Sequence, residues 1–468
     1  MEIIHFSAEC YPVAKVGGLG DVVGALPKYQ NKLGHIAKVV MPAYHTKFLH
    51  QNDFEVVYDN WVSLGYNSIP VRIFREKTNK LGFDLFLVHI AGLLDREKVY
   101  GYNDDTERFL AYQIAALDWI AQWEHQPDVL HCHDHHTGLI PFMVSNCYNY
   151  RHISHIPTVL TIHNAQYQGQ FGWDKLNYLP DFDLRSSNKL DWNNAINPLA
   201  AAIKCVWRIT TVSPSYLEEI SYKANGLENL LAQERAKSVG ILNGIDNEVW
   251  NPQQDPMLHK AFNNRTVENG KKANKDALCD VFSLAKDKPL YTFIGRLVGE
   301  KGADLLPDIF YNALQQSEGE INILVLGSGD PNVEDRLNEL THIFPGRYNA
   351  YIGYNEALSH QIYAGADFLL MPSRVEPCGL NQMYALRYGT IPIVRRIGGL
   401  KDTVIDIGDE GFGICHDQTT IWDVSHAIGR AYELYLDEKR VKEIRKFIMK
   451  IDHSWDSAAQ QYIDLYQM

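Results

Sequence analysis

Short apolar runs alternate with helical patterns along almost the whole chain, and this alternation limits the fold more than any other feature. In the first half the runs are β-branched and bounded by turn residues, as buried strands are: EIIHF, KVVMP, DLFLVHI, DVLHCHD, PTVLTIH and RITTVS. Helical stretches such as RFLAYQIAALDWIAQW and NPLAAAIKCVW lie between them. Strands that alternate with helices predict an α/β fold, with a mostly parallel sheet covered on both faces.

The alternation pauses once and then restarts. Residues 243–276 are polar and rich in Asn, and we expect a linker there. The runs LYTFIGR, INILVLGSGD, NAYIGY, DFLLMPS and IPIVRR follow, and one long helical stretch is expected over 424–449. We therefore predict two doubly wound, Rossmann-like domains, 1–245 and 246–452, with a closing helix in 453–468 that packs back on the first domain. Ligands of such sheets bind beyond the carboxyl ends of the strands, so site residues should follow strands.

The composition excludes several classes of partner. A formal net charge of −13 argues against a surface for nucleic acid or for an anionic membrane, because either would need a basic face. No run approaches the roughly 18 apolar residues of a membrane span, and the opening MEIIHFSAEC lacks the bases and the apolar core of a signal peptide. The seven cysteines form no C-x-x-C pair. We expect a cytoplasmic protein with reduced thiols.

The glycine-rich stretch KVGGLGDVVG follows the first predicted strand. A dinucleotide-binding loop is disfavoured, because eight residues separate the strand from Lys15 and the acidic residue expected about 20 positions further on is missing. A plain turn leaves the crowding of glycines unexplained. Gly17 and Gly18 would let a ligand approach the backbone, and a helix from about Leu19 would direct N–H groups at an anion. With the positive charge of Lys15, the loop is predicted to bind phosphate.

The second half carries matching chemistry. In FIGRLVGEKGAD, Arg296 and Lys301 are expected just past a strand, where two cations could neutralise a diphosphate and stabilise it as it leaves. In MPSRVEPCGLNQMYALRYG, Glu376 lies at a strand-to-helix turn, where a carboxylate could bind sugar hydroxyls or stabilise positive charge at an anomeric carbon. Taken singly, each of these residues also fits an ordinary surface charge or a helix cap.

Other patterns invite different interpretations. HCHDHH would place His131 and His133 on one face of a strand, but no cysteine pair or second histidine pair completes a metal site. Asp181 and Asp183 of PDFD lie in polar coil, which favours a solvated loop over a metal–diphosphate site. Three further aromatic residues could stack on a glycan or serve a core: Trp173, Tyr178 and Trp192.

Several stretches together resemble the bacterial glycogen synthase and plant starch synthase family, in order along nearly the whole chain: AKVGGLGDVVGALPK, HNAQYQG, NGID, GRLVGEKG, PSRVEPCGLNQMYALRYGTIPIVRRIGGLKDTV and SWDSAAQQY. The resemblance implies the GT-B fold, two Rossmann-like domains facing a deep interdomain cleft. It implies transfer of glucose from ADP-glucose to the non-reducing end of glycogen or another α-1,4-glucan, with retention of configuration. It requires no metal or other cofactor, and no nucleic acid or membrane partner.

The resemblance also implies roles for residues. On the first, acceptor-side domain, the residues that would contact the donor's phosphate and sugar region are Lys15, Gly17 and Gly18. His163 would approach the glucose near the reacting carbon, and Asp134 and Asn243 match further site positions. On the second, donor-binding domain, Arg296 and Lys301 would hold the diphosphate, Glu376 the glucose, and Tyr354 would lie near the nucleoside. The backbone beside the sugar and phosphates would come from Cys378, Gly379 and Leu380.

Three positions depart from the family pattern. Tyr384 stands where many relatives of this fold carry a second acid, His135 where many members carry Trp, and Asn381 where others carry Thr. Two alternatives stay open: another retaining hexosyltransferase of this fold that makes a small disaccharide, and a glycan-binding relative that has lost catalysis. The presence of Lys15, Arg296, Lys301 and Glu376 argues against the second.

Overall fold

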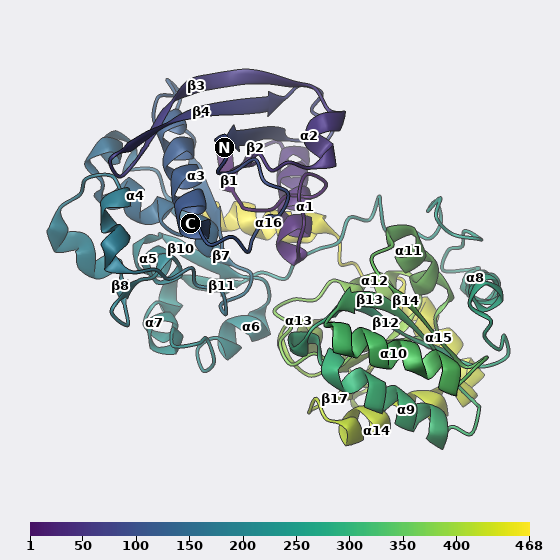
Figure 1. Cartoon of the computed structure of the whole chain (residues 1–468). Coiled ribbons are helices and arrows are strands. Elements are labelled where there is room, and N and C mark those ends of the chain that lie inside the picture. Colours follow the sequence, from purple (N-terminus) through teal and green to yellow (C-terminus); the bar gives the residue numbers. More distant parts are fainter. The chain divides into compact units, whose positions relative to one another are not determined.

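The computed structural model describes residues 1–468, which divide into two compact units. Unit 1 comprises Met1–Gly244 and Trp455–Met468, and unit 2 comprises Ile245–Ser454. The chain therefore leaves unit 1 once and returns to it for its last helix, α16, drawn in yellow in Figure 1. None of the helices combines the length and the apolar composition that a membrane crossing requires.

Unit 1 is built on a nine-stranded sheet with the order β11-β10-β7-β6-β1-β2-β5-β4-β3. Its strands are β1 (Glu2–Phe6), β2 (Ile36–Pro42), β3 (Phe54–Leu64), β4 (Asn67–Glu76), β5 (Asp84–His89), β6 (Val129–His133), β7 (Thr158–Ile162), β10 (Arg208–Thr211) and β11 (Ser238–Gly240). All neighbours are parallel except in the antiparallel β3–β4 hairpin and the β4–β5 pair. Sequence analysis missed this hairpin, because most side chains of β3 are exposed and form no continuous apolar run.

The helices of unit 1 are α1 (Gly18–Lys32), α2 (Lys47–Gln51), α3 (Asp105–Ile120), α4 (Ile140–Asn146), α5 (Pro198–Cys205), α6 (Pro214–Glu219), α7 (Glu228–Gln233) and α16 (Trp455–Tyr466). A two-stranded ribbon, β8 (Asp191–Trp192) with β9 (Ala195–Ile196), lies before α5. Helices α1 and α16 pack side by side and share one core with β1, to which Ile3, Leu26 and Tyr462 contribute. The closing helix of the chain is thus part of the unit that the first strand begins.

Unit 2 contains a fully parallel six-stranded sheet with the order β14-β13-β12-β15-β16-β17. Its strands are β12 (Leu290–Leu297), β13 (Asn322–Gly329), β14 (Tyr348–Ile352), β15 (Phe368–Met371), β16 (Ile391–Arg395) and β17 (Ile414–His416). Its helices are α8 (Val267–Phe282), α9 (Leu306–Gln316), α10 (Pro331–Ile343), α11 (Glu356–Gly365), α12 (Asn381–Arg387), α13 (Gly398–Thr403), α14 (Ile421–Leu436) and α15 (Glu438–Ile448). The α/β fold class expected from the alternation is confirmed in both units.

The chain passes from unit 1 to unit 2 at Gly244, inside the segment 243–276 expected as a linker, but most of that segment belongs to unit 2 and packs into it. The Asp255 carboxylate is buried, where it accepts the Tyr388 hydroxyl at 2.5 Å and lies 2.6 Å from His360 Nδ1. The Trp250 ring stacks on the His360 ring with 3.9 Å between centroids, and α8 begins before the segment ends. Polar side chains of this segment make hydrogen bonds inside the fold. A polar composition alone does not distinguish such a segment from an exposed linker.

The long helical stretch expected over 424–449 is helical, but it is interrupted. It is two helices, α14 and α15, with a break at Asp437. The Asp437 side chain accepts the N–H of Arg440 at 3.0 Å and so caps the start of α15.

Candidate active site

A buried carboxylate shapes the glycine-rich loop between β1 and α1. Glu9 Oε2 accepts the backbone N–H groups of Val16 at 2.6 Å and Gly17 at 3.0 Å. Its other oxygen accepts the Tyr100 hydroxyl at 2.7 Å. Burial raises the pKa of Glu9 above its ordinary value. Sequence analysis did not single out Glu9; its signal was an acid placed three residues after the end of a buried strand.

The glycines of this loop separate into two kinds. A Cβ on Gly24 would lie 2.6 Å from the Tyr11 carbonyl oxygen, and one on Gly20 would lie 3.1 Å from Lys15 Cβ, so packing of α1 accounts for both. A Cβ on Gly17 or Gly18 would meet nothing within 4 Å. The chain's own packing therefore does not explain Gly17 and Gly18, and their open surface leaves the backbone accessible to a ligand.

Lys15 lies in the same loop as these two glycines, as expected. Its Nζ donates to Asp21 Oδ1 at 2.7 Å, in the first turn of α1, and its side chain is about one-third exposed. The helix begins at Gly18 with Gly17 as its N-cap, one residue earlier than the sequence indicated. The ammonium group is thus held beside the start of the helix.

Asp134 and His163 directly follow two neighbouring strands, β6 and β7, and the structure brings them together. The Asp134 carboxylate accepts the backbone N–H of His163 at 2.7 Å. Asp134 has φ of +57°, a conformation that residues other than glycine seldom adopt and that is often found at functional sites. Burial raises the pKa of Asp134 to about 7 and lowers the pKa of His163 to about 3.

Asn243, just past β11, is buried and its Oδ1 has no hydrogen-bond partner in the structure. An orphaned buried oxygen of this kind is uncommon and fits a group that accepts a hydrogen bond from a ligand. His135, at the position where many members carry Trp, packs on His136 with 3.7 Å between ring centroids and 35° between the ring planes. It packs so closely that a Cβ on Gly169 would lie 2.3 Å from His135 Cδ2.

In unit 2, the expected cations occupy different surroundings. Arg296 lies within β12 rather than past its end, because the strand continues to Leu297 in register with β13. Its side chain is half exposed, 3.8 Å from the Glu300 carboxylate. Lys301, on a short 3-10 helix over Gly299–Lys301, places Nζ 2.7 and 2.6 Å from the two oxygens of Glu376. The buried Glu376 carboxylate also accepts the Ser373 hydroxyl at 2.9 Å. The structure thus pairs Lys301 with the carboxylate predicted to hold the sugar.

Gln382 holds the turn of the E-P-C-G-L stretch. Its side-chain amide donates to the carbonyls of Cys378 at 3.0 Å and Gly379 at 2.9 Å. Gly379 has φ of +73°, which favours glycine at this turn. In a trans peptide the N–H lies opposite the C=O, so the N–H groups of Gly379 and Leu380 are directed to the other side of the loop. Sequence analysis missed Gln382, which is the second residue of α12.

A pair of glycines also missed by sequence analysis supports the same loop from behind. Gly398 and Gly399 begin α13, and the Gly399 N–H donates to the Glu376 carbonyl at 3.2 Å. A Cβ on Gly398 would lie 2.0 Å from the Glu376 carbonyl oxygen, and a Cβ on Gly399 would lie 2.0 Å from that of Cys378. Only glycine allows this backbone contact, and the signal was the double glycine directly after β16.

The remaining expected positions are placed as follows. Tyr354 is exposed on the loop before α11. Asn381, at a position where other members carry Thr, donates its side-chain amide to the Ile294 carbonyl of β12 at 2.8 Å. Tyr384, at the position of the second acid, stacks on Trp250 with 3.7 Å between ring centroids. Two of the three departures thus have a packing role within unit 2.

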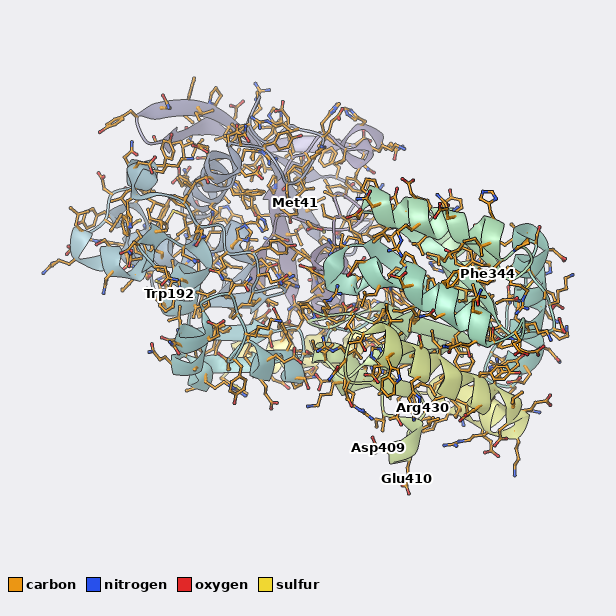
Figure 2. The ribbon with its side chains drawn as sticks, turned by 60° about the horizontal axis from the view of Figure 1, so that its bottom comes forward. Met41, Trp192, Phe344, Asp409, Glu410 and Arg430 are labelled. Atoms are coloured by element: carbon orange, nitrogen blue, oxygen red, sulfur yellow. The ribbon has the colours of Figure 1, made fainter.

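Of the other candidates of the sequence, Asp183 and Trp192 make hydrogen bonds within the chain. Asp183 accepts the backbone N–H of Arg185 at 3.0 Å and pairs with its side chain at the surface. Trp192, labelled in Figure 2, donates its indole N–H to the Gly226 carbonyl at 2.9 Å. Trp173 and Tyr178 lie in a 3-10 helix that contains no fully buried residue. These contacts agree with a solvated loop at Asp183.

Two family models match the chain. Residues 2–233 match the model described as starch synthase catalytic domain, and residues 274–446 match glycosyl transferases group 1. Among curated proteins, the chain is 55% identical over 468 residues to a glycogen synthase of Flavobacterium johnsoniae, covering 100% of this chain and 99% of that protein. It is 38% identical over 483 residues to a glycogen synthase of Streptococcus sanguinis, again covering 100% and 99%.

Solved structures give the same result. The catalytic domain of starch synthase IV from Arabidopsis thaliana, bound to ADP and acarbose, matches with a TM-score of 0.91 and 32% identity, covering 99% of this chain and 98% of that one. A sucrose-phosphate synthase from Thermosynechococcus elongatus matches with a TM-score of 0.64, 17% identity and coverage of 100% and 98%. The second likeness concerns the fold alone.

Proposed function

Because this chain belongs to the family of bacterial glycogen synthases and plant starch synthases, we propose that it transfers glucose from ADP-glucose to the non-reducing end of an α-1,4-glucan such as glycogen, with retention of configuration. The chain is a glycosyltransferase of the GT-B fold, and its function is glycogen synthesis. We propose, beyond this, that the donor is ADP-glucose and that individual residues have the roles given below. The solved starch synthase IV is bound to ADP, the leaving group that ADP-glucose would release, and this supports the choice of donor.

One observation carries the assignment of residues in unit 2: the ion pair of Lys301 and Glu376 beside the E-P-C-G-L turn. Glu376 would hold the glucose hydroxyls, and its negative charge would stabilise the positive charge that develops at the anomeric carbon. Lys301 would hold the Glu376 carboxylate in place and meet the diphosphate as the glycosidic bond breaks. Arg296 would add a second positive charge for the leaving group.

The backbone of the same turn would supply further donors. The N–H groups of Gly379 and Leu380 face away from the carbonyls that Gln382 holds. Such preorganised amides stabilise a negatively charged oxygen without moving during the reaction. We place them, with Cys378, beside the donor's sugar and phosphates, and we place the exposed Tyr354 beside the nucleoside.

In unit 1, Lys15, Gly17 and Gly18 would contact the donor's phosphate and sugar region. The open surface over both glycines supports this role, because nothing in the chain itself requires them to be glycine. His163 would lie near the reacting carbon, with Asp134 holding its backbone and the Asn243 side chain as a further polar contact. No residue here is assigned as a nucleophile, and we propose that the acceptor attacks from the face that the diphosphate leaves.

The test of the proposed function is incorporation of labelled glucose into glycogen from ADP-glucose and from UDP-glucose. We expect a higher kcat/KM with ADP-glucose. A higher kcat/KM with UDP-glucose would overturn the donor assignment. If the protein bound glycogen but transferred glucose from no nucleotide sugar, we would conclude that it is a glycan-binding relative that has lost catalysis. The cytoplasmic location stays a prediction from the sequence.

A further inference from the structure

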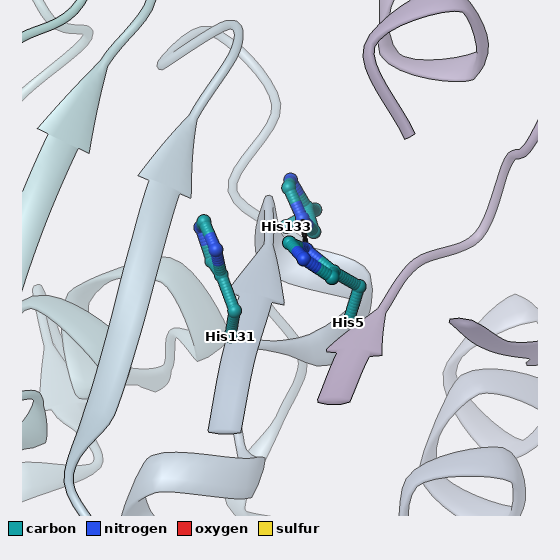
Figure 3. Close-up of side chains that lie close together, drawn as sticks. All are labelled: His5, His131 and His133. Atoms are coloured by element: carbon teal, nitrogen blue, oxygen red, sulfur yellow. Dashed lines mark hydrogen bonds between the residues drawn. The ribbon is translucent and has the colours of Figure 1, made fainter. Parts of the chain in front are cut away.

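The proposed function uses none of the four histidines of the HCHDHH motif, and two of them lie in a cluster with His5. His131 and His133 lie on β6, and His5 lies on the neighbouring β1 in register with His131. All three are fully buried, and their nearest ring nitrogens lie within 4.8 Å of one another (Figure 3). Buried imidazoles this close together need an explanation, because each carries polar atoms that must find partners.

The geometry of the rings disfavours a cation. His131 and His133 stack with 4.4 Å between centroids and 18° between planes, so their in-plane lone pairs do not converge on a point. His131 has both nitrogens engaged elsewhere, with the Tyr466 hydroxyl at 2.6 Å and with Thr161 Oγ1 at 2.6 Å. His5 Nδ1 and His133 Nε2 lie 3.0 Å apart and are joined by one hydrogen bond. The cluster is therefore a hydrogen-bond chain.

The Gln30 side chain sets the donor-to-acceptor direction of these hydrogen bonds. Its Oε1 lies 2.7 Å from His5 Nε2, and an amide oxygen can only accept, so the proton of His5 is on Nε2. His5 Nδ1 is then an acceptor and takes the Nε2–H of His133. His133 Nδ1 is left as an acceptor and takes the Nε2–H of His163, 3.0 Å away. Each neutral imidazole has one donor and one acceptor, so one choice at Gln30 fixes all three rings.

The same glutamine extends the chain to the last helix. Gln30 Nε2 donates to the Tyr466 hydroxyl of α16 at 3.2 Å, and that hydroxyl donates to His131 Nδ1. His131 donates in turn to the hydroxyl of Thr161, which lies 2.6 Å from that of Thr210. Every donor thus has an acceptor, and the chain runs in one direction from His163 through β1, α1 and α16.

Burial supports the neutral state that this chain requires. It lowers the pKa of His5 to about 4 and that of His163 to about 3, and it lowers the pKa values of His131 and His133 well below the ordinary value. A second proton on any ring would put two N–H groups face to face within the chain. The network is therefore consistent only with one proton on each ring.

We propose that His133, itself held by His5, is a positioning residue: it fixes the orientation of the His163 ring and keeps its proton on Nε2, so that Nδ1 is the one acceptor that His163 presents to substrate. This inference rests on the proposed function, which places His163 near the reacting carbon. Helix α16 also belongs to this hydrogen-bond network, because the Tyr466 hydroxyl accepts from Gln30, the residue that sets the direction of the hydrogen bonds.

The first experiment needs no variant. Nitrogen-15 spectra of the imidazoles in the wild-type protein, with His163 assigned by its loss in His163→Ala, report which nitrogen carries the proton. We expect a protonated Nε2 and an unprotonated Nδ1 in His163. The opposite tautomer, or an exchanging mixture of the two, would overturn the proposal.

The second experiment compares two variants of nearly equal shape. In His133→Asn, Oδ1 takes the place of Nδ1 and still accepts from His163, whereas His133→Leu offers no acceptor. Both variants lose the contact to His5 equally. We expect kcat to fall on the order of tenfold or more in His133→Leu, with KM for ADP-glucose changing less than about twofold, and to stay within about threefold of wild type in His133→Asn. Equal kcat in the two folded variants would overturn the proposal.

Failure of this inference and failure of the proposed function are distinguishable. If His163→Ala keeps the kcat of the wild type, the proposed role of His163 is wrong, and the positioning role falls with it. If His163→Ala loses activity but His133→Leu does not, only the positioning role is wrong. Tyr462→Phe is the matched control on α16, because its ring packs on His131 at 5.6 Å but its hydroxyl makes none of the hydrogen bonds that link His163 to Tyr466. We expect wild-type kcat and an unchanged His163 tautomer.

Discussion

At the scale of single residues, the contact between Lys301 and Glu376 is the most informative feature of unit 2. Sequence analysis treated Lys301 as a partner of Arg296 for a diphosphate and Glu376 as a separate sugar ligand. The structure joins the lysine to the glutamate by two contacts below 2.8 Å, with the carboxylate buried. The cation that would stabilise the leaving group therefore also fixes the position of the neighbouring carboxylate.

We expect Lys301→Ala and Arg296→Ala to lower kcat by roughly a hundredfold, the usual effect of losing one preorganised group that stabilises transition-state charge. Glu376→Gln keeps the shape and removes the charge, and it should lower kcat with a modest change in donor affinity. Steady-state kinetics and glycogen binding on the same folded variants measure both effects. Lys286→Ala is the control, because its ion pair with Asp280 lies on the exposed surface. An increase confined to donor KM would show that the cations only anchor the ground state.

Asp134 gives a second prediction at this scale. Burial raises its pKa to about 7 in the folded protein, against about 4 for an ordinary aspartate. Between these values the folded state binds more protons than the unfolded state, so this residue's contribution to stability falls as pH rises from about 4 to about 7. Asp134→Asn removes that dependence and keeps an oxygen that can accept the His163 N–H.

The free energy of unfolding of Asp134→Asn, relative to wild type, should therefore increase between about pH 5 and about pH 7 by up to about 1.4 kcal/mol per pH unit. Urea denaturation of both proteins at several pH values measures the difference. A difference that does not vary with pH would show that the pKa of Asp134 is ordinary.

At the scale of elements, the packing of α1 against its preceding loop separates the roles of four glycines. Gly20 and Gly24 face the loop 9–15 closely, and Gly17 and Gly18 face open space. The same sequence feature thus serves two purposes, and only the positions of neighbouring atoms tell which glycine serves which. The edge hairpin β3–β4 and the break between α14 and α15 are likewise decided by exposure and by a cap, which an apolar pattern does not record.

We expect Gly24→Ala to destabilise the protein, because its Cβ would lie 2.6 Å from a backbone oxygen that cannot move easily. Gly18→Ala should leave stability within about 0.5 kcal/mol, as is usual for a surface change, but lower kcat/KM for ADP-glucose, since the new methyl group would fill space that the donor needs. Thermal unfolding and kinetics on both variants test this. Gly429→Ala is the control: it lies inside α14 in open space, and we expect a gain of about 0.5–1 kcal/mol with no change in activity. Wild-type kinetics in Gly18→Ala would contradict the proposal that this loop contacts the donor.

At the scale of the whole molecule, the buried histidines are concentrated in unit 1. Burial lowers the pKa of His5 and His135 to about 4 and of His163 to about 3, and it lowers the pKa values of His131, His133 and His136 well below the ordinary value. A ring with a lowered pKa binds a proton at higher pH in the unfolded chain than in the folded one. In unit 2 the lowered histidines are His416 and His453. The two units should therefore differ in their response to acid.

A histidine whose folded pKa is lowered contributes stability that is present above its unfolded pKa of about 6.5 and lost as pH falls toward the folded value. Each such ring contributes a slope of up to about 1.4 kcal/mol per pH unit in that window. We expect unit 1 to lose stability faster than unit 2 between about pH 6.5 and about pH 4. Hydrogen exchange at about pH 7 and about pH 5, corrected for the intrinsic rate and compared between β6 or β7 and β12 or β13, measures this. Equal loss of protection in both units would contradict it.

The sequence by itself determined the fold class and the local motifs. Parallel strands buried on both faces must be continuously apolar, so runs such as EIIHF and PTVLTIH indicate β1 and β7 directly, and the alternation with helices leaves few other architectures. The K-x-G-G-L and E-P-C-G-L stretches are local too, because the residues that make each turn are adjacent in the chain. The expected residue roles remain predictions, while the family and the fold are confirmed.

Only the tertiary structure decided which side chains meet. Lys301 and Glu376 come from the ends of different strands, Glu9 reaches forward to the amides of its own loop, and Gly399 supports a turn from another helix. His131 and Tyr466 are 335 residues apart, yet they share a hydrogen bond. Such contacts depend on the order of strands in the sheet and on how closely elements pack. A local pattern records whether a residue is buried, but not which distant group satisfies it.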